Sequence, residues 1–382
     1  MKNVKLFFIY ILIILFLTVT RVFTGGWRAY FEPMDMRILE RYPIQHEAHL
    51  MLRSTYLHLS SINISYILSG YTTEEHRALL PIFTAAIFTN ISSSFFWGSV
   101  IAEVTWWWAS AVATFFLAKK FHQSDSGAFI SGLLVASSPL ASAHIGAANL
   151  HAASSLGLSI VFLIALDLLL NQHVFLFSAL KLSIAFLFSS IIYTYQWVLI
   201  PWMFFISLSE TRRVRSLLIV FCSTCVFLLI QYVFAQLFAL FGIVEHKHLN
   251  DPIDVLMNRL NVNSFSELSS TDRVFSILIN LILEVFNMSP SIVHHIFLAY
   301  SPVIFILSLI GLIRMARFFI FLYLFTLFMS ILLGIINDLS WVVMSSFPLV
   351  YIAAGNGSIL FCRSVQFILS LIHISEPTRR YA

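Results

Sequence analysis

The stretch SFFWGSVIAEVTWWWASAVATFFLAKK, residues 94–120, decides the fold class of this chain. Its apolar part, about 25 residues long, would extend roughly 37 Å as an α-helix, which is enough to cross a hydrocarbon core about 30 Å thick. Two basic residues, Lys119 and Lys120, end it. Lysine and arginine collect on the cytoplasmic side of membrane helices. The stretch therefore predicts a transmembrane helix that ends in the cytoplasm.

The rest of the sequence repeats this pattern. Of its 382 residues 59% are hydrophobic and 10% are charged, with a mean hydropathy of +0.89, whereas soluble proteins have about 25% charged residues. We expect an all-α, multi-pass transmembrane protein of about 10 spans that forms one domain over residues 1–368. The other apolar runs are 6–24, an uncleaved signal anchor by its length and flanks, then 126–145, 148–170, 175–192, 194–209, 216–243, 292–313, 318–336 and 340–361.

The basic clusters predict the topology. With the N-terminus in the cytoplasm, the clusters between the runs all fall on the cytoplasmic side, as the distribution of lysine and arginine in membrane proteins requires. Two polar segments, residues 25–80 and 244–274, then lie outside. The aromatic and mixed composition of the first favours helices that lie along the outer membrane surface. The clusters are Lys2 and Lys5, Lys119 and Lys120, Arg212, Arg213 and Arg215, Arg314 and Arg317, and Arg363.

The end of the sequence reads LSLIHISEPTR at residues 369–379, which resembles the translation of a sequencing-library adapter. We therefore expect residues 369–382 to be an artefactual tail that carries no function. The formal net charge of +4 comes from the short basic clusters, so we expect no nucleic-acid partner.

The first outer segment holds the densest group of ionisable side chains. A carboxylate at the water interface could act as a general base on an acceptor hydroxyl, while an arginine neutralises a departing phosphate. A merely solvated loop explains the same composition equally well. The residues are Glu32, Asp35, Glu40 and Glu47, interleaved with Arg37, Arg41, His46, His49 and Arg53.

Several features together resemble the membrane glycosyltransferases of the GT-C class. A signal anchor is followed directly by the acidic segment and then by Arg77, Leu79, Leu80 and Pro81. A helix ending FLAKKF, residues 116–121, precedes SGLLVASSPL, residues 131–140, and this pair is similar to the family's segment of two helices, the second of which reaches a proline near the outer surface. Residues 193–201 are a weaker likeness.

The resemblance implies a function. Such enzymes transfer a sugar from a polyprenyl-phosphate carrier to a glycan, lipid or protein acceptor on the outer face, here of the inner (plasma) membrane of a bacterium. The catalytic base would be Asp35, with Glu32 and Glu47 as competitors. Where the family often has a second acidic residue, this chain has His144, Asn149 and His151, which disfavours a metal-assisted mechanism. Cations that would bind the lipid phosphate are Arg37, Arg41, Arg77, Lys247 and Arg273.

Other polar residues have simpler interpretations. His246, His248 and Asp251 could bind a divalent cation, but their spacing matches no compact metal signature, so we favour a solvated loop and assign no metal site. Cys222 and Cys225 are treated as small apolar residues. Glu103, well inside its apolar run, is given a structural role in preference to catalysis or transport.

Two other functions stay open. A transporter or flippase should show internal repeats and interrupted helices in matching positions, and we find no convincing repeat. A non-enzymatic membrane subunit would need none of the ionisable groups of the first segment.

Overall fold

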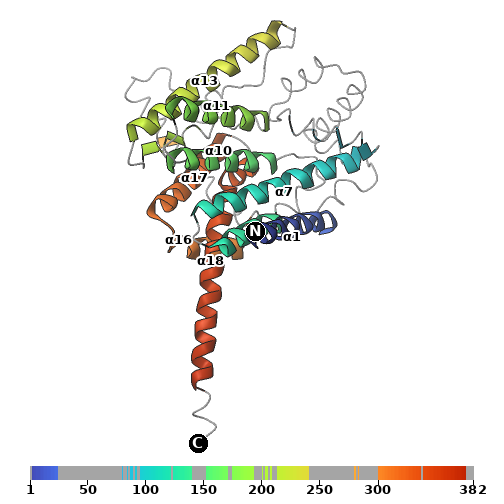
Figure 1. Ribbon diagram of the computed structural model, residues 1–382, viewed down its shortest axis with the longest axis vertical. Helices are drawn as coiled ribbons and strands as arrows, with labels where there is room; N and C mark the ends of the chain where they lie inside the picture. Colours follow the sequence, from blue (N-terminus) through green and yellow to red (C-terminus); the bar gives the residue numbers. More distant parts are fainter. Residues whose placement is uncertain are drawn as a thin grey trace, which may run out of the picture.

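The computed structural model describes residues 2–24, 95–121, 124–139, 152–170, 174–192, 213–240, 300–336 and 339–375, with isolated positions between 80 and 92, 200 and 208, and 279 and 283. These residues form helices and no strand (Figure 1), which confirms the all-α prediction for this part of the chain. The helices are α1 (Lys2–Thr24), α7 (Phe95–Phe121), α8 (Asp125–Ala136), α10 (Ala152–Leu170), α11 (Phe175–Ile192), α13 (Arg213–Leu240), α16 (Pro302–Leu312), α17 (Arg317–Ile336) and α18 (Leu339–Ser375).

Two stretches are long and apolar enough to cross a membrane, judged by length and composition within the described residues. They are Lys5–Val22 of α1 and Val100–Phe121 of α7. Shorter apolar stretches of 10–17 residues occur in α8, α10, α11, α13, α16 and α17.

Helix α7 packs against α1, α8 and α10. The Phe7 ring of α1 contacts Phe115 and Phe116 near the end of α7, at centroid distances of 5.8 and 5.3 Å. Farther along α1, the Ile11 carbonyl oxygen lies 3.4 Å from Nε1 of Trp108. A later residue of α1 thus contacts an earlier residue of α7, so the two helices are antiparallel.

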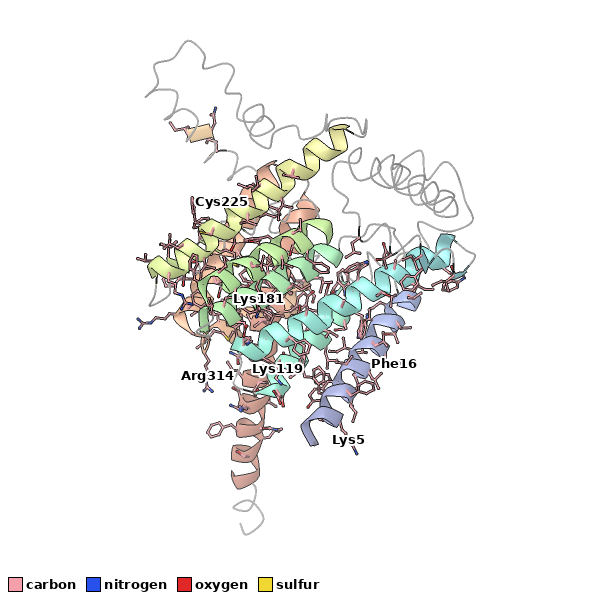
Figure 2. All side chains as sticks on the ribbon, turned by 45° about the horizontal axis from the view of Figure 1, so that its top comes forward. Lys5, Phe16, Lys119, Lys181, Cys225 and Arg314 are labelled. Carbon is pink, nitrogen blue, oxygen red and sulfur yellow. The ribbon has the colours of Figure 1, made fainter. Side chains whose placement is uncertain are left out.

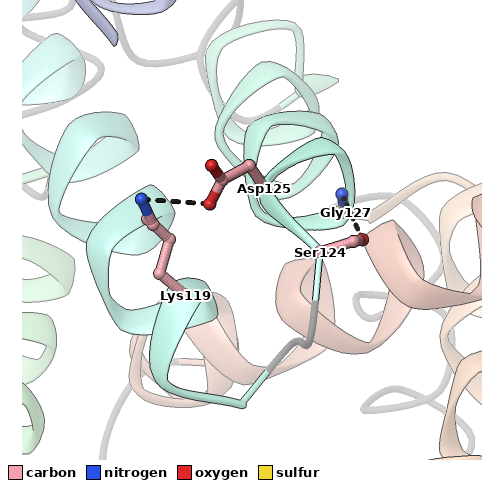
Figure 3. A network of polar contacts seen from close by, with 4 residues as sticks. All are labelled: Lys119, Ser124, Asp125 and Gly127. Carbon is pink, nitrogen blue, oxygen red and sulfur yellow. Dashed lines mark hydrogen bonds and ion pairs between the residues drawn. The ribbon is translucent and has the colours of Figure 1, made fainter. Parts of the chain in front are cut away.

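Helix α8 is antiparallel to α7 as well. It begins at the N-cap Ser124, whose side chain accepts a hydrogen bond from the Gly127 N–H at 3.3 Å (Figure 3), and such a cap satisfies one of the unpaired donors of the first turn. Near its other end, the buried Trp107 of α7 donates from Nε1 to the Val135 carbonyl oxygen at 3.0 Å.

Buried hydroxyl groups join the next helices. Ser189 of α11 donates to the Gly157 carbonyl oxygen of α10 at 3.2 Å, so the end of α11 meets the beginning of α10. Between α11 and α13, Ser223 Oγ lies 3.0 Å from the Ala179 carbonyl oxygen, and Phe186 contacts Phe227 at 5.8 Å. The later residue of α11 contacts the later residue of α13, so the two helices are parallel.

Helix α18 crosses α16 and α8 where its side chains are smallest, in AAGNGS, residues 353–358. A Cβ atom added at Gly357 would overlap the Leu307 carbonyl oxygen of α16, and one added at Gly311 would overlap the Ala353 carbonyl oxygen. Between the two glycines, Asn356 Nδ2 donates to the Gly311 carbonyl oxygen at 2.8 Å. Close backbone approach at small residues is typical of helix pairs in membranes.

The described part of the chain buries hydroxyl groups and exposes large apolar side chains. Ser110, Ser131, Ser183, Ser223 and Thr326 are among the buried polar residues. In contrast, apolar side chains on the outside of α1, α11, α13 and α16 are about half exposed or more, for example Phe8 61%, Phe16 68%, Leu176 74%, Phe221 58% and Val303 64%. Soluble proteins rarely expose contiguous apolar surface of this extent.

Three predicted helix ends differ from the structure. The run 126–145 was expected to be one helix, but α8 ends at Ala136, because the proline that follows at 139 disfavours helical backbone at Ser138. The run 292–313 contains a break at Ser301, whose φ is +65°, and α16 begins only after it at Pro302. Helix α18 continues past the expected end at 361 to Ser375, since its sequence continues with the helix-compatible apolar residues of 365–371.

Replacing Trp107 with phenylalanine is expected to destabilise the bundle more than the same change at Trp108. The Trp107 indole loses a well-formed hydrogen bond, worth about 1 kcal/mol, whereas the Trp108 bond is long at 3.4 Å. Thermal unfolding in detergent, followed by intrinsic fluorescence, measures both variants. Equal losses of stability, or a larger loss at Trp108, would contradict this assignment.

Candidate functional site

The basic residues of several helices meet at one end of the bundle. Lys119 Nζ, at the end of α7, lies 3.0 Å from Asp125 Oδ1, at the start of α8 (Figure 3). Lys120 Nζ lies 3.9 Å from Asp167 Oδ1, near the end of α10. Phe121 contacts Phe319 of α17 at 4.7 Å, which brings the turn between α16 and α17 to the same place.

We call this end of the bundle the basic end. The directions of the helices indicate that further basic residues lie there. Because α1 is antiparallel to α7, Lys5 belongs to it, and because α13 runs parallel to α11, so does Arg215. Figure 2 shows Lys5, Lys119 and Arg314 in the lower part of the molecule, away from the N-terminal end of α7. Several of the clusters that the sequence predicted to share one side therefore lie at one end of the bundle, whereas Arg212 lies outside the described residues.

The opposite end of the bundle holds the helix ends that flank the ranges in which the predicted outer segments 25–80 and 244–274 lie. Helix α1 ends there at Thr24 and α7 begins there at Phe95, so segment 25–94 leaves and returns at this end. Helix α13 also ends there and α16 begins there, which does the same for segment 241–299. We call it the loop end. The predicted site residues themselves lie outside the described residues: Glu32, Asp35, Glu47, Arg37, Arg41, Arg77, Lys247 and Arg273.

A group of buried polar and aromatic side chains lies inside the loop end. Glu103, 4% exposed, is one turn before Trp107 on the same face of α7, so it faces the end of α8 beyond Val135. There the Tyr351 side chain of α18 lies against Ser138, and its ring contacts Tyr300 at 5.5 Å. We call Glu103, Trp106, Ser138, Tyr300 and Tyr351 the loop-end cluster.

Trp106 contributes a buried hydrogen-bond donor to this cluster. Its side chain is 8% exposed, and within the part of the chain that the structure describes its buried Nε1 has no hydrogen-bond partner. A buried donor left unpaired costs about 1–3 kcal/mol. The indole thus points to a place where an acceptor would be stabilising.

Sequence reasoning found Glu103 but missed the rest of the cluster. Its burial agrees with the position predicted well inside an apolar run. Tyr300, Tyr351 and Ser138 come from α18 and from the ends of two other helices, and no local pattern links them. The signal that could have found them is the combination of a polar or aromatic residue with a helix end, which occurs too often to be selective.

The other charged side chains within the predicted apolar runs contact neighbouring side chains. Asp167 faces Lys120, and Lys181 Nζ lies over the Phe177 ring, 4.4 Å from its centroid, as expected for long or charged side chains near helix ends. Cys222 and Cys225 are free thiols on α13. Within the described residues no group of three or more potential ligands could hold a metal ion; His246, His248 and Asp251 lie outside them.

No family model matches this chain, and no curated protein or solved structure shows significant similarity to it.

Proposed function

We propose that this protein is a multi-pass membrane glycosyltransferase that moves a sugar from a polyprenyl-phosphate carrier to an acceptor at the loop end. The observation that supports the proposal is that α1 and α13 end, and α7 and α16 begin, at the end of the bundle opposite the basic residues. The chain ranges that hold the two predicted outer segments connect to these helix ends. This is the arrangement that a lipid-linked donor and an acceptor in water both require, because the reacting groups must meet at the membrane interface.

The membrane part of the proposal is supported by the distribution of side chains. Helices that individually fall short of a full span still expose apolar side chains outward and bury serine and threonine between them. With no hydrophobic force between helices in lipid, small residues and hydrogen bonds hold them together. The single end that collects the basic residues would then be cytoplasmic, and the loop end would face outward.

The chemical part rests on the residue types at the loop end. A carboxylate of segment 25–80 would take the proton of the acceptor hydroxyl, and a cation of either segment would stabilise the lipid phosphate as the carbon–oxygen bond to the sugar breaks. The loop-end cluster supplies aromatic and polar side chains at this end of the bundle, and the Trp106 donor, which has no partner among the described residues, suits a sugar hydroxyl or phosphate oxygen.

Transfer assays test the function. Protein purified in detergent would be mixed with radiolabelled polyprenyl-phosphate sugars and cell-envelope acceptors. Label moving from the carrier to an acceptor supports a glycosyltransferase. If the protein binds the carrier and moves it between leaflets of a vesicle without transfer, it is a flippase; if it does neither, the subunit reading is favoured.

The topology gives a separate prediction. After Cys222, Cys225 and Cys362 are changed to serine, a cysteine at Ser60 is expected to react with a membrane-impermeant maleimide in intact cells. A cysteine at Ala316, in the exposed α16–α17 turn, is expected to react only once the membrane is opened. The reverse pattern would invert the topology, and labelling of both in intact cells would exclude it.

A further inference from the structure

The α16–α17 turn carries two arginines without a carboxylate partner. Arg314 and Arg317 are both exposed, and among the described residues neither makes an ion pair. Lys119 and Lys120 at the same basic end differ, because Asp125 and Asp167 compensate them at 3.0 and 3.9 Å. Unlike the two lysines, the turn therefore carries positive charge that no carboxylate of the described residues compensates.

Each arginine stands at the end of an apolar stripe. On α16, the exposed side chains Val303 64%, Ile306 54%, Leu309 48% and Ile313 79% share one side of the helix and end beside Arg314. On α17, Arg317, Phe321 and Leu324 are spaced by four and three residues, which places them on one face; Phe321 is 62% and Leu324 53% exposed. The hairpin thus presents apolar surface along its length and two guanidinium groups at its basic end.

The two helices are held as one unit, so the stripes keep their relation to the arginines. Ser308 Oγ and Tyr323 Oη lie 3.0 Å apart between α16 and α17. Gly311 is fixed against α18 by the Asn356 side chain at 2.8 Å. The turn is short, and its Met315 N–H donates to the Leu312 carbonyl oxygen at 3.1 Å, which limits how far Arg314 and Arg317 can separate.

We propose that this hairpin binds an anionic phospholipid, with the headgroup phosphate between Arg314 and Arg317 and the acyl chains along the stripes of α16 and α17. Guanidinium groups pair with phosphate through two parallel hydrogen bonds. Basic sites at the cytoplasmic ends of membrane helices bind anionic headgroups, with about 1 kcal/mol for each cation near the surface. This binding is separate from the proposed sugar transfer and does not depend on it.

A lipid competition experiment tests the proposal. The full chain in detergent would be mixed with equal amounts of phosphatidylglycerol and phosphatidylcholine of the same acyl chains, and retained lipids would be counted by native mass spectrometry. Two cations predict a preference for phosphatidylglycerol of about 30-fold. In Arg314→Ala/Arg317→Ala this preference is expected to fall close to one.

Two controls separate a site from diffuse charge. Lys5→Ala/Lys181→Ala removes the same charge from α1 and α11 and is expected to keep the preference, whereas Phe321→Ser, which interrupts a stripe, should weaken retention of both lipids. The proposal is overturned if the arginine variant keeps the preference or if the lysine variant loses it equally. Displacement of the lipid by millimolar glycerophosphoglycerol, which has no acyl chains, would also overturn it.

Discussion

A Gly357→Leu variant is expected to lose the α16–α18 contact and much of its stability. At Gly357 even a Cβ atom would overlap the backbone carbonyl oxygen of Leu307, and a backbone atom in a helix cannot rotate away as a side chain can. Overpacking of a tight interior usually costs about 1–3 kcal/mol, and here the cost should reach or exceed the upper value, because the helices must separate and Asn356 then loses its bond to Gly311.

Thermal unfolding in detergent measures the effect, with a fall in Tm of about 4 °C or more. Ser364→Leu is a matched control, since it places the same side chain on an exposed position of α18 two turns away and should leave Tm unchanged. Gly357→Ala should be intermediate. An unchanged Tm in the leucine variant would show that α16 and α18 do not approach closely at this point.

The same crossing shows what the sequence could and could not predict. The helices α7, α11 and α17 begin and end within three residues of their predicted runs, because each run is bounded by charged or polar residues that cannot be placed in an apolar layer without cost. Which helices pack together depends instead on surface shape. Gly311 and Gly357 are 46 positions apart, and nothing local to either indicates that the two backbones meet.

The candidate site was predictable in a different way. The attachment of segments 25–94 and 241–299 at one end follows from the alternation of apolar runs and basic clusters, and the ion pairs of Lys119 and Lys120 agree with it. The loop-end cluster was not predictable, because its residues come from helices whose packing, of α7, α8 and α18, no local pattern indicates. Asp35 lies outside the described residues, so its role as the catalytic base stays a prediction.

Asp35→Asn is expected to reduce sugar transfer by about 10²–10⁴-fold, the usual contribution of a general base. Asparagine keeps the size and hydrogen-bonding shape of the side chain but cannot accept the proton of the acceptor hydroxyl, so binding of the polyprenyl-phosphate donor should persist. Measuring donor binding and transfer on the same preparation separates the two effects. A loss of both would indicate a structural or donor-binding role for Asp35.

Glu32→Gln and Glu47→Gln serve as matched controls in the same segment, since each removes one carboxylate charge and keeps the size of the side chain. If transfer disappears only in Glu47→Gln or only in Glu32→Gln, the base moves to that residue while the class of enzyme stands. If all three variants transfer sugar as the wild type does, no carboxylate of this group is the base. The only acidic side chain that the structure describes at the loop end is Glu103, and Glu103→Gln would then be the next variant to measure.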